Sequence, residues 1–143
     1  MENSRFKFRV WDKFRGVFAK QITTFKFDRD GNINLVVYLD KANKTREILE
    51  TEKKFTNEFE VLEYTGLKDK NGVEIYEGDI IKELLPDDEA YTFIVDWDKI
   101  SASFVLREIE VPDYYGRFND ELDSFDFVVI GNIYEDVIIS CWV

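Results

Sequence analysis

The sequence predicts a mainly β protein, of the β-rich α+β class, in which an N-terminal β-meander is followed by a small C-terminal barrel. The 143 residues include 13 Phe, 7 Tyr and 3 Trp but only 7 Gly and 2 Pro, and aromatic and β-branched residues favour sheet over helix. Several segments alternate apolar and polar residues with period two, which is typical of half-buried strands. Turn residues separate these segments at short intervals, as they do in small all-β folds.

The N-terminal meander begins with a strand at residues 5–11. Phe6, Phe8 and Val10 alternate there with basic residues, so one face should be buried and the other basic. Residues 12–16 are expected to close a hairpin, and Asp-Arg-Asp-Gly-Asn at residues 28–32 to form a second turn. The four strands of the meander are expected at residues 5–11, 17–22, 23–27 and 33–39.

Residues 40–58 leave two alternatives open, because neither the helix period nor the strand period dominates. The segment is highly charged, with Ile48 and Leu49 at its apolar centre. It is either a short exposed helix or a long polar hairpin. A soft boundary near residue 62 divides the chain into an N-terminal β-rich region (1–62) and the barrel (63–143), which could still pack as one compact unit.

Short apolar segments separated by turns predict the barrel. Its strands are expected at residues 80–85, 91–97, 102–106 and 125–130, followed by a last apolar segment at 137–143. A long acidic excursion covers residues 108–124. Short strands at this spacing, opened by the Gly78-Asp79 turn, are typical of a partly open SH3-like barrel.

Turn residues are most closely spaced in the stretch of residues 64–81, YTGLKDKNGVEIYEGDII. Its Asn-Gly pair tolerates the positive φ angles of a type I′ turn, and its Gly-Asp pair should form a second tight turn. With FKFRVWDK at residues 6–13 and VIGNIYED at 129–136, it resembles the signature of the YopX-like proteins, a family found mainly in bacteriophages and integrated prophages. The resemblance implies that origin and an SH3-like architecture, but no biochemical role. The structural positions of the signature are Tyr64, Gly66, Asn71, Gly72, Gly78, Asp79, Gly131 and Asn132.

Histidine is absent, and Cys141 is the single cysteine. Without histidine, Ser-His-Asp and Cys-His nucleophile activation and nearly every zinc site are excluded. A lone cysteine cannot form an internal disulfide, which fits a reducing compartment. No apolar run approaches the ~20 residues of a transmembrane helix, and the N-terminus carries no hydrophobic signal core. We expect a soluble protein of the bacterial host cytoplasm, with no cofactor.

The net charge of −11 is unevenly distributed. Residues 83–143 hold three basic and fifteen acidic residues and therefore carry −12, whereas residues 1–82 sum to about +1. The basic residues near the N-terminus, with Trp11 and Phe14 as stacking platforms, would suit phosphate contacts. The acidic balance of the whole chain opposes direct nucleic-acid binding, so we expect these bases to pair with acids further along the chain.

Two sets of residues are candidates for chemistry or binding. Asp96 and Asp98 share one side of a strand and could hold a metal ion, but no phosphate loop or nucleophile motif accompanies them, so solvated turn acids are the favoured interpretation. Several aromatic residues could line an exposed groove, although most are expected in the core: Tyr91, Trp97, Phe104, Tyr114, Tyr115 and Tyr134. The candidate interaction surface of the acidic excursion comprises Tyr114, Tyr115, Glu108, Glu110, Asp113 and Glu121.

The sequence thus predicts a non-catalytic phage or prophage accessory protein that binds a host or phage protein, and it is compatible with oligomerisation. One alternative is an inhibitor whose acidic C-terminal part imitates nucleic-acid phosphates and occupies a basic host protein. The other is a metal-dependent enzyme that uses Asp96 and Asp98, which the sequence favours least.

Overall fold

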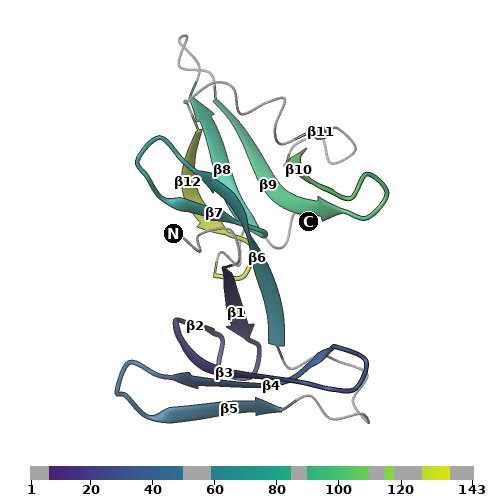
Figure 1. Ribbon diagram of the computed structural model, residues 1–143. Helices are drawn as coiled ribbons and strands as arrows, with labels where there is room; N and C mark the ends of the chain where they lie inside the picture. The colour runs from purple at the N-terminus through teal and green to yellow at the C-terminus, as the bar shows by residue number, and fades with distance from the viewer. Residues whose placement is uncertain (1–6, 50–58, 85–89, 110–114, 118–126, 136–143) are drawn as a thin grey trace, which may run out of the picture. The chain divides into compact units, whose positions relative to one another are not determined.

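The computed structural model describes residues 7–49, 59–84, 90–109, 115–117 and 127–135, and within them all regular structure is β (Figure 1). The mainly β prediction is therefore confirmed. The strands are β1 Phe8–Asp12, β2 Val17–Ala19, β3 Gln21–Phe27, β4 Ile33–Leu39, β5 Thr45–Leu49, β6 Phe59–Lys68, β7 Glu74–Tyr76, β8 Asp79–Leu84, β9 Ala90–Asp98, β10 Ser103–Glu108, β11 Tyr115–Arg117 and β12 Phe127–Asn132.

The chain divides into two compact units. The N-terminal unit is Phe8–Leu62, and the C-terminal unit combines Glu63–Val143 with Met1–Lys7. Strand β6 contributes residues to both units, and it belongs to a four-stranded sheet of order β2-β1-β6-β7.

The N-terminal unit contains the β1–β2 hairpin and a three-stranded antiparallel sheet of order β3-β4-β5. The single meander expected over residues 5–39 is thus divided between two sheets, because β1 takes β6 rather than a later meander strand as its second neighbour. The core of the unit joins the hairpin, the sheet and β6 through Val10, Ala19, Val36, Tyr38, Ile48 and Phe59. These side chains are at most 5% exposed.

Of the two alternatives for residues 40–58, the structure shows a hairpin in the part that it describes. β5 pairs with β4 in regular antiparallel register, from Leu39↔Thr45 to Leu35↔Leu49. Asp40 stabilises the turn because its carboxylate accepts hydrogen bonds from the backbone N–H groups of Ala42 and Lys44, at 2.8 and 2.9 Å. Residues 50–58 lie outside the described residues.

A buried polar network connects the end of β1 to β4. The Asp12 carboxylate is fully buried and accepts hydrogen bonds from the Tyr38 hydroxyl, at 2.7 Å, and from the Arg15 guanidinium, at 2.9 Å. Burial alone would raise the pKa of Asp12, but the hydrogen bonds from Tyr38 and Arg15 hold that pKa below its ordinary value. Burial and the bond to Asp12 raise the pKa of Tyr38 to about 12.

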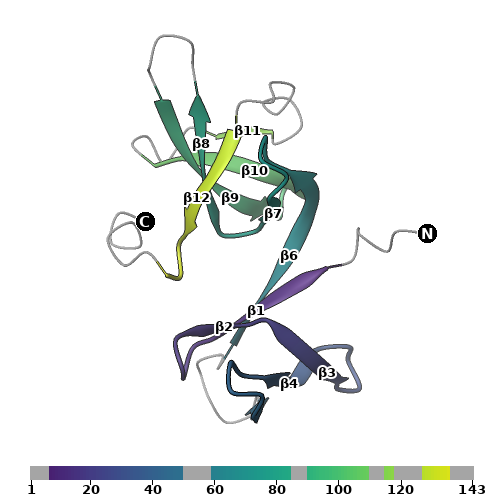
Figure 2. The same cartoon turned by 90° about the vertical axis from the view of Figure 1, so that its left-hand side faces the viewer.

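The C-terminal unit is built on a five-stranded sheet of order β11-β10-β9-β8-β12, which curls into a half barrel (Figure 2). Its core cluster is Ile75, Ile81, Phe93, Val95, Leu106 and Phe127. The rings of Phe93 and Phe127 lie 6.3 Å apart between centroids. Strand β11 was not predicted: residues 115–117, placed in the acidic excursion by the sequence, pair with β10. The last predicted segment, 137–143, is outside the described residues.

Candidate functional site

The β9–β10 hairpin exposes apolar side chains of the C-terminal unit. Trp97 and Phe104 are cross-strand partners, and their rings meet edge to face with centroids 5.0 Å apart. Phe104 packs against the core, whereas Trp97 is 38% exposed. Ile100, in the turn between the strands, is 96% exposed. The hairpin therefore presents an aromatic and an aliphatic side chain to solvent at a tip that adds little to the core.

The turn of this hairpin also contains an unusual backbone conformation. Ala102 has a φ of 50°, in the left-handed region that a residue with a Cβ rarely adopts. Asp98 stabilises the turn, since its Oδ2 accepts hydrogen bonds from the Ser101 hydroxyl, at 2.6 Å, and the Ser101 backbone N–H, at 3.1 Å. These two bonds hold the pKa of Asp98 below its ordinary value. Ile100 thus lies in a turn that is held by Asp98 and contains one left-handed residue.

The second candidate carboxylate, Asp96, is engaged differently. Its Oδ2 accepts a 2.6 Å hydrogen bond from Nε of Arg107 on β10, and its side chain is 41% exposed. Asp96 and Asp98 thus have separate partners, a guanidinium and a turn. Within the described residues, no group of three or more Asp, Glu or Cys side chains is arranged to hold a metal ion.

We predict that Asp96→Asn combined with Asp98→Asn leaves the free energy of unfolding nearly unchanged, because the Asp96–Arg107 pair is partly exposed and Asp98 lies in a surface turn. Chemical denaturation measures this change. Micromolar Mg²⁺ or Mn²⁺ binding by the wild-type protein in a calorimetric titration, lost in the double variant, would instead support the metal-dependent enzyme.

The other aromatic candidates are distributed between surface and interior. Tyr91 is 43% exposed at the start of β9. Tyr134 packs over Gly78, since a Cβ built on that glycine would lie 2.9 Å from Tyr134 Cε2. Tyr115 opens β11 and pairs with Arg107, and Glu108 ends β10. The remaining predicted surface residues, Tyr114, Glu110, Asp113 and Glu121, lie outside the described residues.

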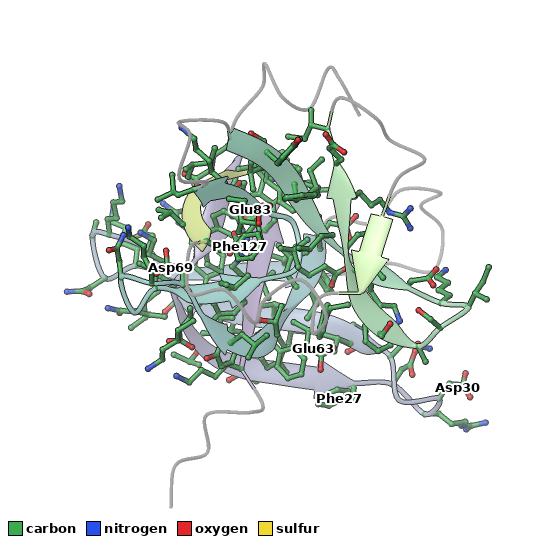
Figure 3. All side chains as sticks on the ribbon, turned by 90° about the horizontal axis from the view of Figure 1, so that it is seen from above. Phe27, Asp30, Glu63, Asp69, Glu83 and Phe127 are labelled. Carbon is green, nitrogen blue, oxygen red and sulfur yellow. The ribbon has the colours of Figure 1, made fainter. Side chains whose placement is uncertain are left out.

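The first signature turn is organised by Asp69, whose role was not predicted from the sequence. Asp69 is 7% exposed, and its carboxylate accepts backbone hydrogen bonds from Asn71, Val73 and, on β12, Val129, at 2.8–3.0 Å. Burial raises the pKa of Asp69, but these three bonds outweigh burial and lower it. Figure 3 labels Asp69 near Phe127 of β12. The Asp-x-Asn-Gly spacing was the available signal, and it did not reveal the bond to β12.

The other signature positions also have structural roles. Gly72 and Gly78 adopt φ angles of 80° and 84°, as the turn chemistry predicts. Asp79 is buried and accepts a 2.8 Å hydrogen bond from the Tyr76 backbone N–H. Asn132, also buried, accepts bonds from the backbone N–H groups of Tyr134 and Glu135. Of the remaining positions, Tyr64 of β6 is buried and packs against Tyr76 of β7. Gly66 lies where the β6–β7 register shifts, and Gly131 lies at a bulge in β12.

Three of the described basic residues near the N-terminus are paired with carboxylates, and for Lys7 and Lys13 the acid lies further along the chain, as expected. Lys7 binds Glu74 at 3.1 Å, Lys13 binds Glu60 at 2.9 Å, and Arg15 binds Asp12. The guanidinium of Arg9 stacks over the Phe18 ring, 4.6 Å from its centroid. These contacts neutralise most of the described bases that could have contacted phosphates. In the same described ranges, no helix is long and apolar enough to cross a membrane.

Comparison with known proteins identifies the family and supports the fold. A search of curated proteins gave no significant match. A crystal structure of protein EF1440 from Enterococcus faecalis matches with a TM-score of 0.60 and 24% sequence identity, over 91% of this chain and 94% of that one, which supports the fold alone. The model of the YopX protein family matches residues 7–137. The chain therefore belongs to the YopX family.

Proposed function

We propose that this chain is a non-catalytic protein-interaction module that binds a host or phage protein through the β9–β10 hairpin. The exposure of Ile100, 96% at the hairpin tip, is the observation that carries this proposal. Trp97 on the same hairpin adds a half-exposed aromatic ring whose position is fixed by Phe104. Aromatic and aliphatic side chains held on a rigid scaffold are typical anchors of protein interfaces.

The backbone of the tip supports the same proposal. A left-handed conformation at Ala102 costs about 1–2 kcal/mol compared with glycine. Strained residues concentrate at functional sites. We therefore place the partner at the tip rather than at the signature turns, whose polar groups are used within the fold.

The acidic inhibitor remains the alternative function. Of the carboxylates in residues 83–143 that the structure describes, Asp96, Asp98 and Glu135 accept hydrogen bonds from within the fold. Their distribution over a strand and two turns does not favour a continuous phosphate-like stripe. The charge of −12 in residues 83–143 would still attract a basic partner at long range. Binding experiments therefore have to distinguish the acidic inhibitor from the hairpin-mediated interaction module.

We predict that Ile100→Asp weakens partner binding about tenfold or more, because it places a charge where an apolar anchor is buried on association. Affinity capture from the bacterial host supplies the partner, and calorimetric titration of the purified pair measures the change. Ile100 is so exposed that its replacement should leave the thermal midpoint of the free protein unchanged.

Phe14→Asp is the matched control, because Phe14 is 84% exposed at the tip of the β1–β2 hairpin in the other unit. It should bind as the wild type does. If Ile100→Asp and Trp97→Ala both bind as the wild type does, the hairpin is not the interface. An affinity that then falls steeply as the Debye length shrinks, from ~10 Å at 0.1 M salt to ~3 Å at 1 M, would favour the acidic inhibitor.

A further inference from the structure

The three-stranded sheet of the N-terminal unit has one face that its core does not use. Along β4, Val36 and Tyr38 point into the core and are at most 2% exposed. Successive side chains of a strand alternate between faces, so Leu35, Val37 and Leu39 lie on the opposite face. These three are partly exposed and form an aliphatic strip along β4. Figure 1 shows β4 as the central strand of this sheet.

Polar side chains border most of this strip, although the register partner of Leu35 on β5 is Leu49. By register, Lys26 and Thr24 of β3 lie beside Leu35 and Val37, and Glu47 and Thr45 of β5 lie beside Val37 and Leu39. All four bordering side chains are exposed. An apolar centre with a polar rim is the usual anatomy of a protein interface. The charges of the rim differ across the sheet, since Lys26 lies on the β3 side and Glu47 on the β5 side.

We propose that this face binds the same face of a second copy of the chain, forming a symmetric dimer of stacked sheets. A twofold axis parallel to β4 places β4 on β4 and β3 over β5 of the second copy. Lys26 of each copy then lies over the edge that carries Glu47 of the other. A twofold axis across the strands would place Glu47 near its own symmetry mate, so the charges select the first arrangement.

Net charge opposes a second copy less at the N-terminal unit than at the C-terminal unit. Residues 8–62 contain eleven basic and nine acidic residues and carry +2, whereas the C-terminal unit carries −13. Two copies would repel each other through their C-terminal units, but the N-terminal unit opposes approach much less. Strands ~4.8 Å apart and residues ~3.4 Å apart give the face an area of roughly 250 Å², so the dimer is weaker than interfaces of the standard ~800 Å² per partner.

Sedimentation velocity of the full chain, from micromolar to near-millimolar concentration, tests the proposal. The wild-type protein should show a concentration-dependent monomer–dimer equilibrium. Lys26→Glu and Glu47→Lys, each alone, should raise the dimer Kd roughly tenfold, because each turns two symmetry-related attractions into repulsions. The double variant should restore a Kd near the wild-type value.

Val37→Asp should abolish the dimer, and Phe14→Asp, an exposed change outside the face, should not. Thermal melts establish that each variant is folded. If Val37→Asp does not fold, the Lys26→Glu and Glu47→Lys variants still test the dimer. A wild type that is monomeric at every concentration would overturn the proposal. So would a dimer whose Kd is insensitive to both single exchanges, or one that the double variant fails to restore.

Discussion

Gly78→Val is expected to lower the free energy of unfolding by about 2–4 kcal/mol, because two costs add at this position. The φ of Gly78 is 84°, which a β-branched residue adopts only under strain. A Cβ at Gly78 would also lie 2.9 Å from the Tyr134 ring. The backbone cannot relax easily, since Gly78 N–H donates to Val95 C=O at 2.8 Å and Gly78 C=O accepts from Ile133 N–H at 2.9 Å.

Gly72→Val separates these two costs and is the matched control. Gly72 has a similar φ of 80°, but a Cβ there would meet no atom within 4 Å. Its expected cost is therefore the backbone strain alone, about 1–2 kcal/mol. Denaturant titration of both variants gives the comparison. Equal destabilisation by the two changes would show that the contact with Tyr134 does not contribute.

Local chemistry made the turns of this fold predictable. Asn71-Gly72 and Gly78-Asp79 require positive φ at their glycines whatever the rest of the chain does, and alternation marked β1 and β9 for the same local reason. Pairing between distant strands leaves no such local signal. The pairing of β1 with β6 depends on which strand edges are free in the folded sheet. The same holds for the short strand β11, which lies within an acidic segment.

The candidate site was only partly predictable, because exposure depends on position along a sheet face. Tyr91, Phe93, Val95 and Trp97 alternate in the same sense, so the pattern places them together. The structure buries the middle two and exposes the outer two, since only the centre of the face is covered. The carboxylates show the same limit: Asp12 and Asp69 resemble ordinary turn acids in sequence, and distant partners on β4 and β12 bury them.

Asp12→Ala is expected to lower the free energy of unfolding by about 2–4 kcal/mol, because it removes the acceptor from a buried network. The Tyr38 hydroxyl would lose its 2.7 Å bond at a residue that is 2% exposed. Tyr38→Phe should cost less, about 1–2 kcal/mol, since Arg15 still binds the carboxylate. The double variant should cost less than the sum of the two single changes, because the unsatisfied partner is then absent. Additive costs in urea titrations would contradict a coupled network.

The same network predicts how stability depends on pH. The pKa of Tyr38 is raised to about 12 in the folded protein, against ~10 in an unfolded chain. Its contribution is therefore fully present below about pH 10 and is lost as the pH rises towards 12. The lowered pKa of Asp12 acts at the other end, where stability present above about pH 4 is lost as the pH falls through the folded pKa. Tyr38→Phe should reduce the loss of stability between about pH 10 and 12 without abolishing it, because burial also raises the pKa of Tyr64 in the other unit. An alkaline loss of the same size in Tyr38→Phe and in the wild type would show that proton release from Tyr38 is not coupled to unfolding.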